Sequence, residues 1–136
     1  MNGRSFLTPA EELSDGLTEA HWRASAGRSY YALFQEALSA LVRWGFAVPP
    51  RENIHAFVRL RFVYSTDPEA REIGRAVEHL VRLRNDADYK LVSSERFLSS
   101  EEAIRAVAVS RRTIAILDAI ESDPDRLAEV IASIRP

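Results

Sequence analysis

The residues best suited to chemistry lie together in one segment, Leu83–Tyr89, which reads LRNDADY. If this segment is helical, with about 100° between successive residues, Arg84 falls about 40° from Leu80, inside the apolar stripe that also contains Ile73. A guanidinium in such a place needs a negatively charged or hydrogen-bonding partner, because burying it unpaired costs several kcal/mol. We expect that partner to be Asp88 one turn further on, a carboxylate of a neighbouring helix, a partner subunit or an anionic ligand.

These candidate partners imply two different roles for Arg84. A pair with a carboxylate would hold the helices in register, whereas an anionic ligand would make the arginine part of a functional site. Arg28, on an earlier segment, either lines the same cleft or is an ordinary solvated charge. It precedes two adjacent tyrosines that cannot both face a core, and the helical spacing assigns Tyr31 to the core and Tyr30 to its edge.

His55 is the candidate histidine. It precedes an aromatic-rich face, which is typical of a satisfied, partly buried histidine, and the functional interpretation places it near Arg84. Glu52 and His55 have the Glu-x-x-His spacing of a di-iron bundle, but that architecture needs two such motifs and two further inward glutamates. The chain has one copy. We therefore expect no metal site and no cofactor.

Composition limits the class of protein. The chain has 136 residues, 46% of them hydrophobic and 28% charged, which is typical of one folded domain. The formal charge of −2 argues against bulk attraction to nucleic acid or lipid, so any anion must meet a local patch. The absence of cysteine excludes disulfides, thiolate zinc sites and cysteine nucleophiles. No apolar run is long enough for a membrane span and no signal peptide is recognisable, so we expect a cytoplasmic protein without membrane contact.

Capping residues and apolar spacing predict helices throughout and no strand. We expect one domain, residues 1–136, that folds as an all-α antiparallel four-helix bundle. Its core spans about 18–122, with short extra helices at about 9–14 and 124–134. The first opens on a capping box of Thr8 and Glu11, and the long second helix ends at Gly45. The later helices begin after Pro50, at Asp67-Pro68, at Ser99 or Ser100, and at Asp123-Pro124.

Four segments, in order, resemble the HEPN superfamily over roughly residues 23 to 120. The first is Arg28–Phe34 (RSYYALF), and the second contains His55 with Phe57 and Phe62. The third is Leu83–Tyr89, which is similar to the family's L-R-x-x-A-D-Y helix, and the fourth is Ser99–Ala103 (SSEEA).

The resemblance implies a HEPN-like bundle that forms a homodimer and is paired with a minimal nucleotidyltransferase, as in toxin–antitoxin or defence systems. Many members are metal-independent ribonucleases with an R-x(4–6)-H motif, in which the arginine stabilises phosphate charge and the histidine transfers protons. Arg84 matches the motif arginine and Asn85 a polar residue that often follows it. Tyr89 occupies the histidine position, and a phenol of pKa about 10 is a poor base at neutral pH.

This replacement favours a nucleotide- or RNA-binding module over a nuclease. The expected anion-binding residues are Arg84, Asn85, Asp88, Tyr89, Arg28 and His55. One alternative is a metal-independent ribonuclease toxin with Arg84 and Tyr89 as catalytic residues, or with His55 in place of the motif histidine. Another alternative is a non-enzymatic protein-interaction bundle, with Trp44 and Phe46 at its interface.

Overall fold

The computed structural model describes residues 1–92 and 95–136, and all regular elements in this part of the chain are helical. The expected all-α class is confirmed. The α-helices are α1 Leu7–Ser14, α2 Glu19–Arg43, α3 Ile54–Val63, α4 Pro68–Tyr89, α5 Glu101–Glu121 and α6 Pro124–Ala132. Short 3-10 turns, η1 Gly3–Phe6, η2 Arg51–Asn53 and η3 Glu95–Phe97, precede α1, α3 and α5. None of the helices described is long and apolar enough to cross a membrane.

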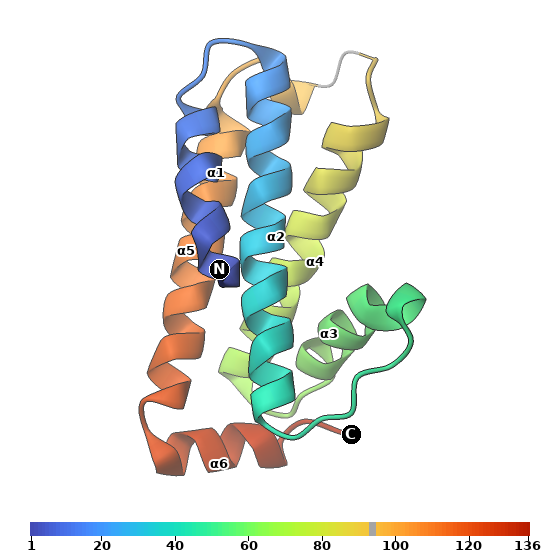
Figure 1. Ribbon diagram of the computed structural model, residues 1–136, viewed down its shortest axis with the longest axis vertical. Helices are drawn as coiled ribbons and strands as arrows, with labels where there is room; N and C mark the ends of the chain where they lie inside the picture. The colour runs from blue at the N-terminus through green and yellow to red at the C-terminus, as the bar shows by residue number, and fades with distance from the viewer. Residues whose placement is uncertain (93–94) are drawn as a thin grey trace.

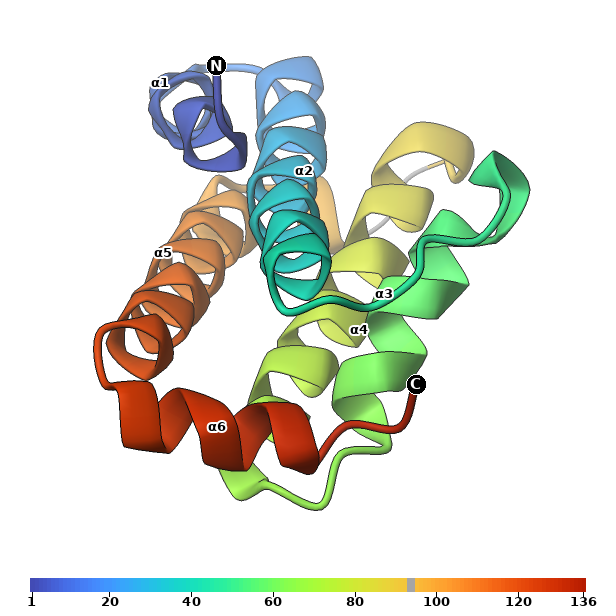
Figure 2. The same ribbon diagram turned by 60° about the horizontal axis from the view of Figure 1, so that its bottom comes forward.

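The helices are arranged around α2, which contacts α1, α4 and α5 (Figure 1). In that view α1 and α4 run upward, whereas α2 and α5 run downward. Helix α3 packs mainly on α4, and α6 crosses the bottom of the molecule (Figure 2). This arrangement is compatible with a helical bundle. It brings α2, α3 and α4 together on the side of the molecule away from α1.

Three helix starts and the end of α2 follow the capping signals in the sequence, whereas Ser100 before α5 makes no side-chain cap. Thr18 caps α2, and the α2 chain reverses at Gly45, whose φ of +92° is in the left-handed region that favours glycine. The Phe46 N–H then donates to the Leu41 carbonyl at 3.0 Å, as in a Schellman motif. Asp67 and Asp123 cap α4 and α6 just before a proline. These features fix the ends of the long helices.

The first helix does not begin at the predicted capping box. Helix α1 starts at Leu7, so Thr8 lies inside it and caps nothing. The turn η1 leads directly into α1 because it is anchored on α2: a Cβ on Gly3 would lie 2.7 Å from the Gln35 Cβ. Arg4 adds ion pairs to α2 and α5. Packing of the turn therefore overrides the local cap.

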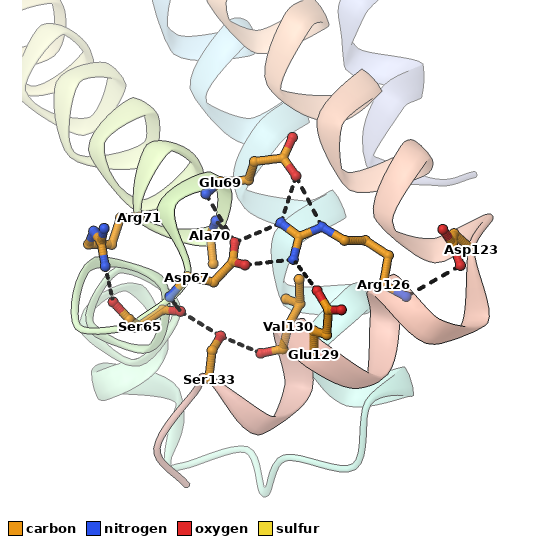
Figure 3. A network of polar contacts seen from close by, with 10 residues as sticks. All are labelled: Ser65, Asp67, Glu69, Ala70, Arg71, Asp123, Arg126, Glu129, Val130 and Ser133. Atoms are coloured by element: carbon orange, nitrogen blue, oxygen red, sulfur yellow. Dashed lines mark hydrogen bonds and ion pairs between the residues drawn. The ribbon is translucent and has the colours of Figure 1, made fainter.

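A polar network fixes α6 against the start of α4 (Figure 3). The Arg126 guanidinium lies 2.6 Å from a carboxylate oxygen of Asp67 and 2.6 Å from one of Glu69. Ser65 and Ser133 share a hydroxyl hydrogen bond of 2.7 Å beside it. The last helix is thus attached by specific contacts, although it ends at Ala132 and is slightly shorter than expected.

The predicted orientation of α2 is wrong at the tyrosine pair. Tyr30 is only 1% exposed, whereas Tyr31 is half-buried. The spacing of apolar residues along this helix also predicts that Ala20, Ala24 and Val42 face the core, but these three residues are exposed. The reason is that α2 lies at the centre of the fold and is covered on several sides, so a single apolar stripe does not describe it.

Candidate functional site

The guanidinium of Arg84 lies between α4 and α2. Its Nη2 donates to the Tyr31 hydroxyl at 2.9 Å, and its Nε is 3.0 Å from the Asp88 carboxylate. The Arg84 side chain is 21% exposed and that of Asp88 is 45% exposed. This Nε contact is an ion pair whose geometry does not meet that of a hydrogen bond. The Arg84 guanidinium therefore has protein partners on two sides, the Tyr31 hydroxyl and the Asp88 carboxylate.

Aromatic rings form one side of this environment. The Arg84 guanidinium carbon lies 5.4 Å from the centre of the Tyr31 ring and 5.9 Å from that of Tyr30. These distances are within the range of cation–π attraction. The rings hold the positive charge close to apolar surface without neutralising it.

His55 joins the same group of residues through Tyr30. The Tyr30 hydroxyl and the His55 Nδ1 are 2.5 Å apart, and the imidazole stacks on Phe34 with the ring centres 4.2 Å apart. His55 is nevertheless exposed, and its Nε2 has no hydrogen-bond partner in the described part of the chain. One ring nitrogen of His55 is therefore held by the protein and the other faces outward.

Removal from water favours the neutral forms of Tyr30 and His55. Burial raises the pKa of Tyr30 well above its ordinary value, with the positive charge of Arg84 acting in the opposite direction. Burial also lowers the pKa of His55, and here the charge of Arg84 acts in the same direction. A neutral imidazole and a protonated phenol are thus expected at neutral pH.

Two hollows meet at His55. One, of about 320 Å³, lies between α3 and α4 and is lined by Tyr30, His55, Arg59, Glu78 and Arg82 among others. The second, of about 270 Å³, lies between α2 and the start of α3, with Tyr31, Arg51 and His55 in its lining. In the first, the guanidinium nitrogens of Arg59 and Arg82 are 3.6 and 3.8 Å from Glu78, so one carboxylate is shared loosely by two cations. Both hollows are cationic.

The structure unites some of the predicted site residues and not others. Arg84, Asp88 and Asn85 are in contact, although the Arg84–Asn85 hydrogen bond is long at 3.4 Å. Tyr89 is the last residue of α4, is 75% exposed, and makes no hydrogen bond, ion pair or ring contact with Arg84. Arg28 is exposed on α2 and has no hydrogen bond or ion pair to any described residue.

Sequence reasoning missed the most deeply buried arginine. Arg23 is 9% exposed and donates to the carbonyls of Asp86 and Ala87 at 3.1 and 2.9 Å, which fixes the end of α4 against α2. It also pairs with Glu19. Arg23 precedes Tyr30 by seven residues and so lies on the same face of α2, which is the signal that could have revealed it.

The expected interface residues are not free surface. Trp44 and Phe46 are partly buried and pack against the core. The Trp44 indole N–H donates to Glu121 at 3.2 Å, and its ring meets Phe62 edge-on. Both residues belong to the packing at the end of α2. Each of the two side chains keeps part of its surface exposed, so a role of this pair in an interface stays a prediction.

The site is suited to a ligand that carries both an anionic group and an aromatic ring. Among the described residues, no three or more histidine, aspartate or glutamate side chains gather in a way that would hold a metal ion. Comparisons with protein families, curated proteins and solved structures find no match for this chain. The function is therefore argued from the arrangement of Arg84, His55 and the two tyrosines.

Proposed function

We propose that this protein is a nucleotide- or RNA-binding module whose site lies where α2, α3 and α4 meet. The observation that carries the proposal is the Arg84 guanidinium held over Tyr30 and Tyr31, each of which lines one of the two arginine-lined hollows. Guanidinium groups bind phosphate oxygens in a fork, and aromatic or imidazole rings stack on bases. Nucleotides carry both features in one ligand.

The charge distribution supports a local anion site on a chain whose net charge is −2. Arg51, Arg59 and Arg82 line the two hollows, and Glu78 is the carboxylate among the residues lining the first. Coulomb attraction to a phosphate does not need a basic protein if the cations are concentrated in one place. The hollows flanking His55 are such a place.

The test is a binding titration with Arg84→Ala. Fluorescence anisotropy with a labelled RNA oligonucleotide, and calorimetry with mononucleotides, give the affinity. A hydrogen bond to a charged group is worth about 1.5–3 kcal/mol, so we expect affinity to fall by about tenfold or more. The matched control is Arg105→Ala, which removes an exposed arginine from α5. Equal binding by wild type and Arg84→Ala would contradict the proposal.

Arg84→Met separates binding from a purely structural role. It preserves much of the apolar stem while removing the charge, so stability is retained and binding is lost if Arg84 serves a ligand. The protein-interaction alternative predicts that Arg84→Ala lowers stability sharply, that Arg84→Met is tolerated, and that even the wild type binds no nucleotide. Urea unfolding alongside the titration distinguishes the two.

A metal-independent ribonuclease is a second candidate, favoured by the position of His55. Its Nε2 is not engaged by the protein, and its lowered pKa keeps the ring neutral and able to accept a proton. This version predicts RNA cleavage in the presence of a chelator, lost in His55→Gln and retained in Tyr89→Phe. Intact RNA after incubation with a high concentration of wild-type protein would exclude it.

The resemblance to HEPN proteins extends the proposal to partners. We propose a cytoplasmic homodimer that works with a nucleotidyltransferase as a toxin–antitoxin or defence pair. Exposed apolar side chains near the end of α4 and the start of α5 support an interface there: Tyr89, Leu91, Leu98 and Ile104. Light scattering after size-exclusion chromatography measures the mass. A monomer at high protein concentration would contradict the homodimer.

A further inference from the structure

A third hollow lies on the side of α4 that faces away from Arg84. It has a volume of about 350 Å³ and is formed by α4 and α5. Its lining residues are Glu72, Arg75, Ala76, His79, Val109 and Arg112. Nine residues separate Arg75 from Arg84, which is half a turn on a helix of about 100° per residue. This hollow is therefore distinct from the site of the proposed function.

Two arginines from different helices meet in this hollow without partners. Neither Arg75 nor Arg112 has a hydrogen bond or ion pair to any other described residue. Glu72 lines the same hollow but forms no ion pair with either arginine. Both arginines are exposed at the hollow, and an anion placed between them would be attracted by both guanidiniums.

The floor of the hollow is apolar. Ala76 is almost completely buried, and Val109 is partly buried against the core. A rim with two arginines over an apolar floor suits a ligand that has an anionic group and a short apolar body. His79 at the rim adds a further hydrogen-bonding group.

We propose that the hollow between α4 and α5 is a second ligand site that binds an organic phosphate monoester. The phosphate oxygens lie between Arg75 and Arg112, each of which offers a planar fork of N–H donors. The esterified carbon lies over Ala76 and Val109. The site does not require Arg84, so it stands even if the proposed nucleotide site fails.

The experiment follows the side-chain N–H signals of Arg75 and Arg112 in nitrogen-15 NMR spectra of the whole protein, so that binding in this hollow is read separately from binding near Arg84. The probe is phenyl phosphate. Inorganic phosphate tests the anionic group alone, and phenol tests the apolar ring alone. We expect saturable shifts with phenyl phosphate, weaker binding of inorganic phosphate and none of phenol. Arg75→Gln and Arg112→Gln should each weaken phenyl phosphate binding about tenfold or more, since each removes charged hydrogen bonds.

One variant serves as the control. Arg111→Gln changes the neighbouring arginine of α5, which pairs with Glu11 outside the hollow. It should bind phenyl phosphate as the wild type does. Shifts that do not saturate, equal weakening in Arg111→Gln, or equal binding of phenol would each overturn the proposal. Inorganic phosphate binding as tightly as phenyl phosphate would overturn the assignment of an ester.

Discussion

Replacing Arg23 by alanine is expected to be the most damaging change to a charged residue near the site. The Asp86 carbonyl would keep its hydrogen bond from the Lys90 N–H, but the buried Ala87 carbonyl would lose the guanidinium. An unsatisfied buried carbonyl costs about 1–3 kcal/mol. The lost contact with the Phe97 ring, 4.8 Å away, adds about 0.5–2 kcal/mol. We expect a total loss of about 3 kcal/mol.

Urea unfolding followed by circular dichroism measures this loss. For a chain of 136 residues, about 3 kcal/mol corresponds to a fall in Tm on the order of 10 °C. The matched control is Arg28→Ala, which removes an exposed arginine from the same helix and should change stability by less than about 0.5 kcal/mol. If Arg23→Ala and Arg28→Ala are equally stable, the inferred attachment of the end of α4 is refuted.

Two further predictions concern backbone packing and titration. Gly74→Ala should destabilise the protein by about 1–3 kcal/mol, because the new Cβ would lie 2.5 Å from the Val63 backbone nitrogen. Gly27→Ala, where the new Cβ would meet open space, should stabilise the protein by about 0.5–1 kcal/mol. Urea unfolding of the two variants tests both signs. The pKa of His55, read from its ring-proton NMR signals, should be below about 6.5 in the wild type and should rise in Arg84→Ala without reaching the ordinary value, since burial is the larger cause. Stability contributed by neutral His55 is complete above about pH 6.5 and is lost as the pH falls through the folded-state pKa. An unchanged pKa in the variant would refute the electrostatic link.

The long helices were predictable because their signals are local. Caps at Thr18, Asp67 and Asp123 and the left-handed Gly45 act on their own backbone neighbours, so the sequence alone places them. The start of α1 was not predictable in this way. It depends on Gly3 fitting against α2, a contact between residues far apart in the sequence.

The candidate site was likewise predictable only where its contacts are local in the sequence. The inward position of Arg84 follows from the regular apolar stripe of α4, and Asp88 is one turn away on the same helix. The roles of Tyr30 and Tyr31 were reversed, because α2 is covered by helices on several sides and its faces cannot be ranked by periodicity alone. The contact of His55 with Tyr30 depends on where α3 packs, which no spacing within one helix reveals.

The small expected contribution of the Arg84–Asp88 pair to stability supports the proposal that Arg84 binds a ligand. Its partner Asp88 is 45% exposed, and ion pairs at such positions contribute about 0.2–1 kcal/mol. A leucine or methionine fully buried in the same stripe would contribute about 1.5–3 kcal/mol. An apolar residue at this position would therefore contribute at least as much to stability as the Arg84–Asp88 ion pair. The structural arginine of this region is Arg23, whose hydrogen bonds to the carbonyls of Asp86 and Ala87 attach the end of α4 to α2.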